Sequence, residues 1–138
     1  MRGTTRDPER FTEIERAGIE AVEADPDRVG TVLDHVGDVA VVAWLLGSAA
    51  GDAEEVAALH GSRLERLLEE LVDTPVRGFV YEGAGNVQPS TLQNGAALVQ
   101  RAADRWRIRV AVIEPDLSDW GGWVEIARAE IHALLGAR

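Results

Sequence analysis

The chain has 138 residues, the size of one ordinary domain, and we expect residues 1–138 to form a single domain. Acidic residues outnumber basic ones 24 to 14. The resulting net charge of -10 argues against nucleic acid as a partner, because phosphate backbones are bound by basic surfaces. The absence of cysteine excludes disulfides, thiol catalysis and thiolate metal sites.

The apolar segments are too short for a membrane protein. The longest unbroken run, Val39 to Leu46, is far below the roughly 20 residues that span a bilayer. The first residues carry no apolar segment of the kind found in signal peptides. We therefore expect a cytoplasmic protein that does not bind membranes.

The first third of the chain alternates between short strands and helices. Arg2–Thr5 is predicted to be a strand, followed by a helix that Asp7 caps, Pro8 opens and Gly18 ends. The same pattern then repeats as a strand over Ile19–Ala24, a helix from Asp25-Pro26 to Gly37, and an all-apolar strand over Val39–Leu46.

The rest of the chain continues this alternation with longer helices. Loops are predicted over Gly47–Asp52 and Gly83–Pro89. Between and after them we expect a helix over Ala53–Leu71, a strand over Val76–Tyr81, a helix from a Ser90 cap to Trp106, a strand over Ile108–Ile113 and a last helix that begins near Trp120.

Strict alternation of strands and helices with short connections predicts right-handed crossovers and a parallel sheet between helix layers. A run that is apolar at every position, such as Val39–Leu46, is typical of a strand covered on both faces. We therefore predict an α/β fold, a three-layer sandwich around one parallel sheet of about five strands.

Five segments, in this order and spacing, carry a resemblance to a known family. They are Arg2–Arg10, Glu23–Asp27, Val39–Ser48, Arg77–Tyr81 and Ile108–Pro115. These segments resemble the second to sixth strands, with their following turns, of an atypical or extended short-chain dehydrogenase/reductase, an NAD(P)-binding Rossmann family. The resemblance covers nearly the whole chain and implies a Rossmann-like fold.

The chain departs from this family at two places. The family's first strand and glycine-rich, pyrophosphate-binding turn would precede Arg2, and no such segment is present. The family's catalytic serine would lie near Gly83-Ala84 and its Tyr-x-x-x-Lys pair near Leu92 and Ala96, yet none of these residue types is there, and the chain contains no lysine. Hydride transfer in the family needs a hydroxyl whose pKa is lowered by that lysine. We therefore assign no catalytic residue.

The resemblance leaves five residues that could contact the adenosine half of NAD(P): Thr5, Arg6, Asp25, Gly47 and Ser48. In the family, a basic residue after the second strand can meet an adenosine 2′-phosphate, and an aspartate after the third strand lies near the adenine. Because the pyrophosphate site is missing, we expect no high-affinity cofactor. NAD(P) would bind only if an N-terminal segment were supplied.

The histidines and the glycine beside one of them have structural interpretations. His60, on the apolar stripe of a predicted helix, is interpreted as a half-buried core group with its hydrogen bonds made, with a functional role as the alternative. Gly61 is predicted to allow close packing against the sheet. His35 and His132 are isolated, and no pair has the spacing of a helical zinc site, so we expect no metal.

The four tryptophans have separate interpretations. Trp44 is predicted to lie in the core, and Trp106, at a helix end, is predicted to cover the sheet edge. Trp120 and Trp123 either pack the last helix on the sheet or contribute to a subunit interface, where large aromatic side chains are enriched.

The sequence favours a degenerate NAD(P)-binding-type domain without dehydrogenase chemistry that acts by binding or assembly. One alternative is the C-terminal part of an NAD(P)-dependent epimerase or reductase whose N-terminal strand and glycine-rich loop are missing from this chain. Another is a small-molecule sensor of unknown ligand. Without the first strand, Arg2–Thr5 and Val39–Leu46 either pair directly or keep open edges beside a bare sheet face, which predicts a homodimer with both segments at its interface.

Overall fold

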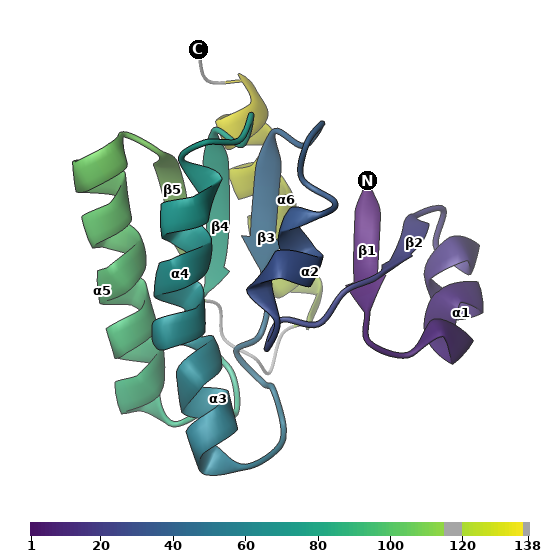
Figure 1. The fold of residues 1–138 in the computed structure, drawn as a ribbon, viewed down its shortest axis with the longest axis horizontal. Coiled ribbons are helices and arrows are strands. Elements are labelled where there is room, and N and C mark those ends of the chain that lie inside the picture. The colour runs from purple at the N-terminus through teal and green to yellow at the C-terminus, as the bar shows by residue number, and fades with distance from the viewer. Residues whose placement is uncertain (115–119, 137–138) are drawn as a thin grey trace.

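Two parallel β-sheets form the framework of a mixed α/β fold (Figure 1). The structure, a computed structural model, describes residues 1–114 and 120–136, and the side chains of residues 120–124 lie outside this description. The smaller sheet pairs β1 (Arg2–Thr5) with β2 (Glu20–Glu23). The larger sheet has the order β3 (Val41–Trp44), β4 (Gly78–Glu82), β5 (Arg109–Ile113).

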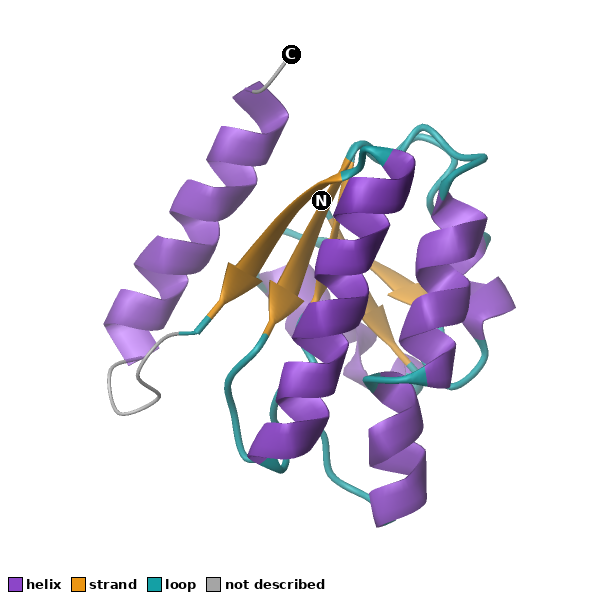
Figure 2. Cartoon of the chain, turned by 90° about the vertical axis from the view of Figure 1, so that its left-hand side faces the viewer, coloured by secondary structure: helices purple, strands orange, loops and turns teal. Residues whose placement is uncertain are grey.

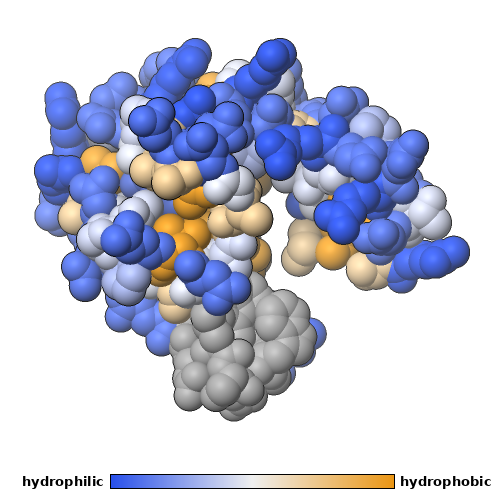
Figure 3. Space-filling view, turned by 90° about the horizontal axis from the view of Figure 1, so that it is seen from below, coloured by the Kyte–Doolittle hydropathy of each residue, from blue (hydrophilic) through white to orange (hydrophobic). Residues whose placement is uncertain are grey.

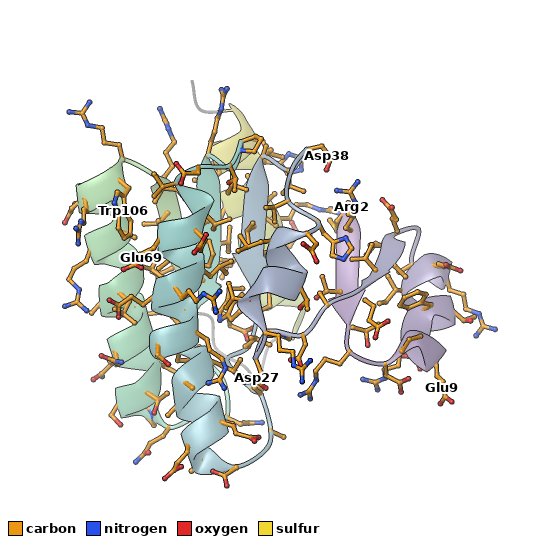
Figure 4. All side chains as sticks on the ribbon, in the orientation of Figure 1. Arg2, Glu9, Asp27, Asp38, Glu69 and Trp106 are labelled. Carbon is orange, nitrogen blue, oxygen red and sulfur yellow. The ribbon has the colours of Figure 1, made fainter. Side chains whose placement is uncertain are left out.

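The prediction of one parallel sheet of about five strands is wrong, because β1 and β3 do not pair. Of the two outcomes that the sequence left open, direct pairing and two open edges, the structure has the open edges. Arg2 of β1 points across the opening toward Asp38, which precedes β3 (Figure 4). Its guanidinium donates to the Asp38 carboxylate and, over 3.0 Å, to the carbonyl oxygen of His35. The two sheets are therefore joined here by a side chain instead of a strand ladder.

Helices cover both faces of the three-stranded sheet. α4 (Ser62–Leu71) and α5 (Pro89–Trp106) pack on one face, and α6 (Trp120–Gly136) packs on the other (Figure 2). The remaining helices are α1 (Phe11–Arg16) against β2, α2 (Val29–Leu33) against α4, and α3 (Ala53–Leu59), which leads into α4.

β4 is the central strand, and every residue of it is buried. Successive side chains of a strand point to opposite faces, so Phe79 and Tyr81 join the core under α4 and α5, whereas Val80 packs with Ile113 and with Ala127 of α6. Trp44 also lies in the first of these cores, as predicted, and its indole N–H donates to the carbonyl oxygen of Leu59 over 3.0 Å.

Several local predictions are confirmed. The Asp7 side chain accepts a hydrogen bond from the backbone N–H of Glu9 over 3.0 Å, and Pro8 opens the short 3-10 turn Pro8–Arg10 that leads into α1. Gly18, with a φ of 79°, adopts the left-handed conformation that follows this helix.

Other helix boundaries differ from the prediction. The Asp25 side chain accepts from the backbone N–H of Asp27 in a turn and does not cap α2, which starts at Val29 and ends at Leu33, before Gly37. α5 begins with Pro89 as its first residue, so Ser90 lies inside the helix and not at its cap.

The helix predicted over residues 53–71 is two helices. α3 ends at Leu59, and Gly61 has the non-helical angles φ -130° and ψ -109° before α4 begins. Gly61 thus serves as a break between helices rather than as a close contact with the sheet. The break turns the His60 side chain inward, where it is fully buried.

Within residues 1–114 and 120–136, no helix combines the length and the apolar character that crossing a lipid bilayer requires.

Candidate functional site

The carboxyl ends of the strands face the viewer in Figure 3. Seen from this side, a hollow separates the part formed by β1, β2 and α1 from the larger part of the molecule, and apolar residues line both of its walls. In open parallel sheets, ligands bind outside the carboxyl ends of the strands, where the order of the strands is interrupted. The interruption between β1 and β3 is therefore the candidate ligand-binding site.

One wall of the opening is the free edge of β1. The carbonyl oxygens of Met1 and Thr5 accept hydrogen bonds from β2 and the residue after it, each over 3.1 Å. Backbone groups alternate in direction along a parallel strand. The N–H and C=O groups of Arg2 and Thr4 therefore point away from β2, into the opening.

The other wall is the free edge of β3. The carbonyl oxygen of Ala40 accepts from the backbone N–H of Gly78 over 3.1 Å, so Ala40 and every second residue after it face β4. By the same alternation, the N–H and C=O groups of Val41 and Ala43 point into the opening. We call the space between these edges the inter-sheet slot, bounded by Arg2 and Thr4 on one side and by Val41 and Ala43 on the other.

A polar cavity of about 340 Å³ lies beside the slot, at the carboxyl end of β2. Arg6 and Asp25, two of the five residues that the sequence proposed for adenosine binding, both line it. Thr31, also in the lining, accepts a hydrogen bond from the Asp25 N–H over 2.8 Å and so holds the turn in place. The cavity combines guanidinium and carboxylate groups, which suit a ligand with hydroxyl, amine or phosphate groups.

Thr5 lies at the end of β1, but its hydroxyl serves the adjacent turn. Its Oγ1 accepts from the backbone N–H of Asp7 over 3.1 Å and is 3.3 Å from the Asp7 carbonyl oxygen. Thr5 therefore does not line the cavity, and its hydroxyl stabilises the turn that contains Arg6.

Gly47 and Ser48 follow β3 and lie against the loop after β4. The Gly47 N–H donates to Oε1 of Glu82 over 2.7 Å, and Ser48 Oγ accepts from the Asn86 N–H over 3.1 Å. A Cβ atom at Gly47 would lie 1.9 Å from the carbonyl oxygen of Ala84, so only glycine fits there. The structure thus brings Arg6 and Asp25 into one cavity, whereas Gly47 and Ser48 contact the end of β4 and its following loop and do not line that cavity.

Glu82 is a site residue that the sequence reasoning missed. It is buried at the carboxyl end of β4, next to Gly83, and its carboxylate binds the Gly47 N–H. The available signal was a carboxylate placed directly after an apolar strand. Glu82 thus holds the segment after β3 against the end of β4.

His60 and Tyr81 form a buried pair beneath this edge. His60 Nδ1 lies 2.6 Å from the Tyr81 hydroxyl oxygen, and Nε2 lies 2.9 Å from the Leu46 carbonyl oxygen. Because a carbonyl oxygen only accepts, Nε2 carries the proton and Nδ1 accepts from the hydroxyl. Burial lowers the pKa of His60 and raises that of Tyr81, so both groups are neutral. The interpretation of His60 as a core histidine with its hydrogen bonds made is confirmed, but the side chain is fully buried and not half-buried as predicted.

In the part of the chain that the structure describes, no group of three or more His, Asp or Glu side chains could hold a metal ion. Gly83 and Ala84 follow β4 directly, and Leu92 and Ala96 lie on α5. The groups that this edge presents are the Arg6 and Asp25 side chains in the cavity and the unpaired backbone groups of the slot. The side chains of Trp120 and Trp123 lie outside the described residues.

Comparisons of the chain with models of protein families, with curated proteins and with solved structures found no match, so the geometry of the site carries the argument on function.

Proposed function

We propose that this chain is an incomplete Rossmann-like, nucleotide-binding-type domain that acts by binding and assembly and not by hydride transfer. The observation that carries this proposal is the inter-sheet slot, where the edges of two parallel strands remain open. In a doubly wound sheet with the strand order 3-2-1-4-5-6, the first strand lies between the second and the fourth. β1 and β3 would be these two neighbours, and the slot would be the place of the first strand.

An extended peptide segment is the occupant that fits the slot. Arg2, Thr4, Val41 and Ala43 each direct an N–H and a C=O group into it, and a strand parallel to both walls would bond to all of them. Open strand edges of this kind are templates for pairing with another chain. The proposed assembly function follows because a partner strand would supply hydrogen bonds to these unpaired backbone groups.

The cavity with Arg6 and Asp25 supports the nucleotide part of the proposal. It lies at the carboxyl ends of β1 and β2, where the resemblance implies the adenosine half of a dinucleotide. A strand that entered the slot would also bring its following turn to this edge, and such turns hold pyrophosphates when they open a helix. Without that turn, only the adenosine contacts remain, and affinity for NAD(P) stays low.

Two other assignments use the same slot. If the occupant also supplies catalytic groups, the chain is the C-terminal part of an NAD(P)-dependent epimerase or reductase, and carbonyl reduction by the assembled complex would identify it. If the occupant is a second copy, the chain is a homodimer in which both open edges are covered. A small-molecule sensor would instead bind its ligand at the Arg6 cavity with no occupant in the slot.

Hydrogen–deuterium exchange of single amides will test the slot. We expect the Val41 and Ala43 amides to exchange about 100-fold faster than those of Val42 and Trp44 in the same strand, because the latter pair with β4. A probe peptide, acetyl-Lys-Val-Ala-Val-Ile-Val-Gly-Gly-Lys-amide, should slow exchange at Val41 and Ala43 about tenfold.

The matched control is the same peptide with N-methyl groups on the alternate residues that would face β3. The methyl groups keep the peptide carbonyl oxygens from approaching that edge, so Val41 and Ala43 should gain no protection. Equal protection of all four amides in the dilute chain would contradict open edges. Protection that increases with protein concentration alone would identify a second copy as the occupant.

Adenosine 2′-monophosphate should bind the cavity only weakly, with a dissociation constant near 1 mM, or about -4 kcal/mol. Arg6→Gln should weaken this binding about threefold, because an exposed ion pair contributes up to about 1 kcal/mol. Arg10→Gln, one turn further on and outside the cavity lining, is the control. Chemical-shift titration measures both variants, and micromolar affinity of the unaltered chain for NADH or NADPH would contradict the proposal.

A further inference from the structure

A second cavity, of about 260 Å³, lies at the edge of the sheet opposite the candidate site, where β4 and β5 begin. Its apolar lining includes Leu71, Val72, Trp106 and Ile108. Val72, which directly follows α4, is 50% exposed, although Leu68 and Leu71 in the last turn of α4 are core residues. The cavity thus presents apolar surface to solvent at the ends of α4 and α5.

Arginines surround this cavity in a chain whose net charge is -10. Arg77, Arg107 and Arg109 line it, and the guanidinium carbon of Arg105 lies 5.1 Å from the centroid of the Trp106 ring. Trp106, labelled in Figure 4, lies at the carboxyl end of α5. α1 carries both glutamates and an arginine, whereas the charged residues that line this cavity are all arginines.

Three of these arginines, Arg77, Arg105 and Arg107, carry the argument for a ligand. Within residues 1–114 and 120–136, Arg77, Arg105 and Arg107 form no ion pair with a carboxylate. Asp73 and Asp104, which are close to them in the sequence, are exposed, and among the described residues neither forms an ion pair with these arginines. A cluster of guanidinium groups without carboxylate partners recognises anions.

Arg107 stands at a backbone position that favours glycine. Its φ of 56° and ψ of 29° are left-handed, and among the described residues it is the one non-glycine residue with a positive φ. The residue that ends a helix in this conformation is usually glycine, because glycine has no Cβ to clash. The chain therefore keeps an arginine at the rim where a glycine would suit the backbone better, which points to a role for its side chain.

We propose that this arginine-rimmed cavity binds an acidic peptide segment of a partner protein, with a bulky apolar side chain against Trp106 and Ile108. A small anion would leave the apolar lining uncovered. A purely apolar ligand would bury guanidinium groups without partners, which is unfavourable. In a segment with carboxylates on both sides of a leucine or phenylalanine, the apolar side chain would cover the apolar lining and the carboxylates would pair with the arginines.

Fluorescence anisotropy with the labelled peptide acetyl-Asp-Glu-Leu-Phe-Glu-Asp-amide tests this proposal on the full chain. We expect saturable binding that weakens at least fivefold between 20 mM and 500 mM salt, because exposed charge pairs are screened. The peptide with Asn and Gln in place of Asp and Glu should bind at least tenfold more weakly, as should the peptide with Ala-Ala in place of Leu-Phe.

Arg107→Gly should weaken binding about threefold without lowering the Tm, because glycine suits the left-handed position. Arg77→Gln should weaken binding by a similar factor, and Arg16→Gln, on exposed α1, should leave it unchanged. Three outcomes would each overturn the proposal: equal affinity for the charged and uncharged peptides, binding unaffected by both rim variants, and self-association of the chain that Arg107→Gly abolishes. The last would make a second copy the occupant.

Discussion

Replacing His60 with alanine should lower the free energy of unfolding by about 3 kcal/mol. His60 is fully buried, and its two ring nitrogens bind the Tyr81 hydroxyl and the Leu46 carbonyl oxygen. The substitution leaves a cavity and deprives the carbonyl oxygen of its donor, and Tyr81 keeps only a 3.3 Å contact with the Leu92 carbonyl oxygen. Denaturant unfolding at pH 7 measures the loss. His60→Gln, which keeps a donor, should cost less, and equal costs would contradict the hydrogen-bonding role.

The same histidine should make stability depend on pH. Burial lowers the pKa of His60 in the folded chain, whereas the unfolded imidazole titrates near 6.5. Below that pH the unfolded state binds a proton that the folded state excludes. The contribution of His60 to the free energy of unfolding is therefore fully present above about pH 6.5. It decreases as the pH falls below this value, by at most about 1.4 kcal/mol per pH unit. His60→Ala should show a shallower slope between pH 7 and 5.5, and parallel slopes would contradict this reasoning.

The order of elements was predictable because each strand and helix has a local pattern. All five strands occur within one or two residues of Arg2–Thr5, Ile19–Ala24, Val39–Leu46, Val76–Tyr81 and Ile108–Ile113, with shorter extents at several ends. Alternation between apolar segments and turn residues reports which residues are extended or helical. It does not report which strands are neighbours.

The break at His60 and the division of the sheet depend on contacts between distant residues. The apolar stripe from Val56 to Leu64 continues through the break, so periodicity predicts one helix there. The bond from His60 to Tyr81, 21 positions along the chain, draws the side chain inward. Likewise, the Arg2 side chain reaches Asp38, 36 positions away, where a strand ladder was expected.

The candidate site was predictable in part, because the order of strands and helices places some of its residues together. Arg6 and Asp25 follow two strands of one parallel sheet, and the carboxyl ends of such strands meet at one edge, so their shared cavity follows from the order of elements. The signal for Glu82, a carboxylate directly after an apolar strand, is weak, because a single glutamate at such a place usually faces solvent. Its partner is the backbone N–H of Gly47, 35 positions earlier in the chain.

Gly95→Ala should destabilise the chain by about 3 kcal/mol, although glycine to alanine inside a helix is usually favourable by about 1 kcal/mol. Gly95 is buried within α5, and a Cβ there would lie 2.0 Å from the Tyr81 hydroxyl oxygen and 2.6 Å from the ring carbon that bears it. Tyr81 is fully enclosed and bound to His60, so its ring has no free space into which it can move. α5 would have to shift away from β4, which loosens the core between them.

Two further variants make this prediction specific. Gly30→Ala, in α2, places its Cβ in open space and should instead stabilise the chain by up to about 1 kcal/mol. In the Tyr81→Phe background the nearest clashing atom is absent, so Gly95→Ala should cost about 1 kcal/mol less than in the unaltered chain. Thermal and urea unfolding of the four members of this cycle measure the coupling. Strictly additive costs would show that the Tyr81 hydroxyl does not hold α5 at its present distance from β4.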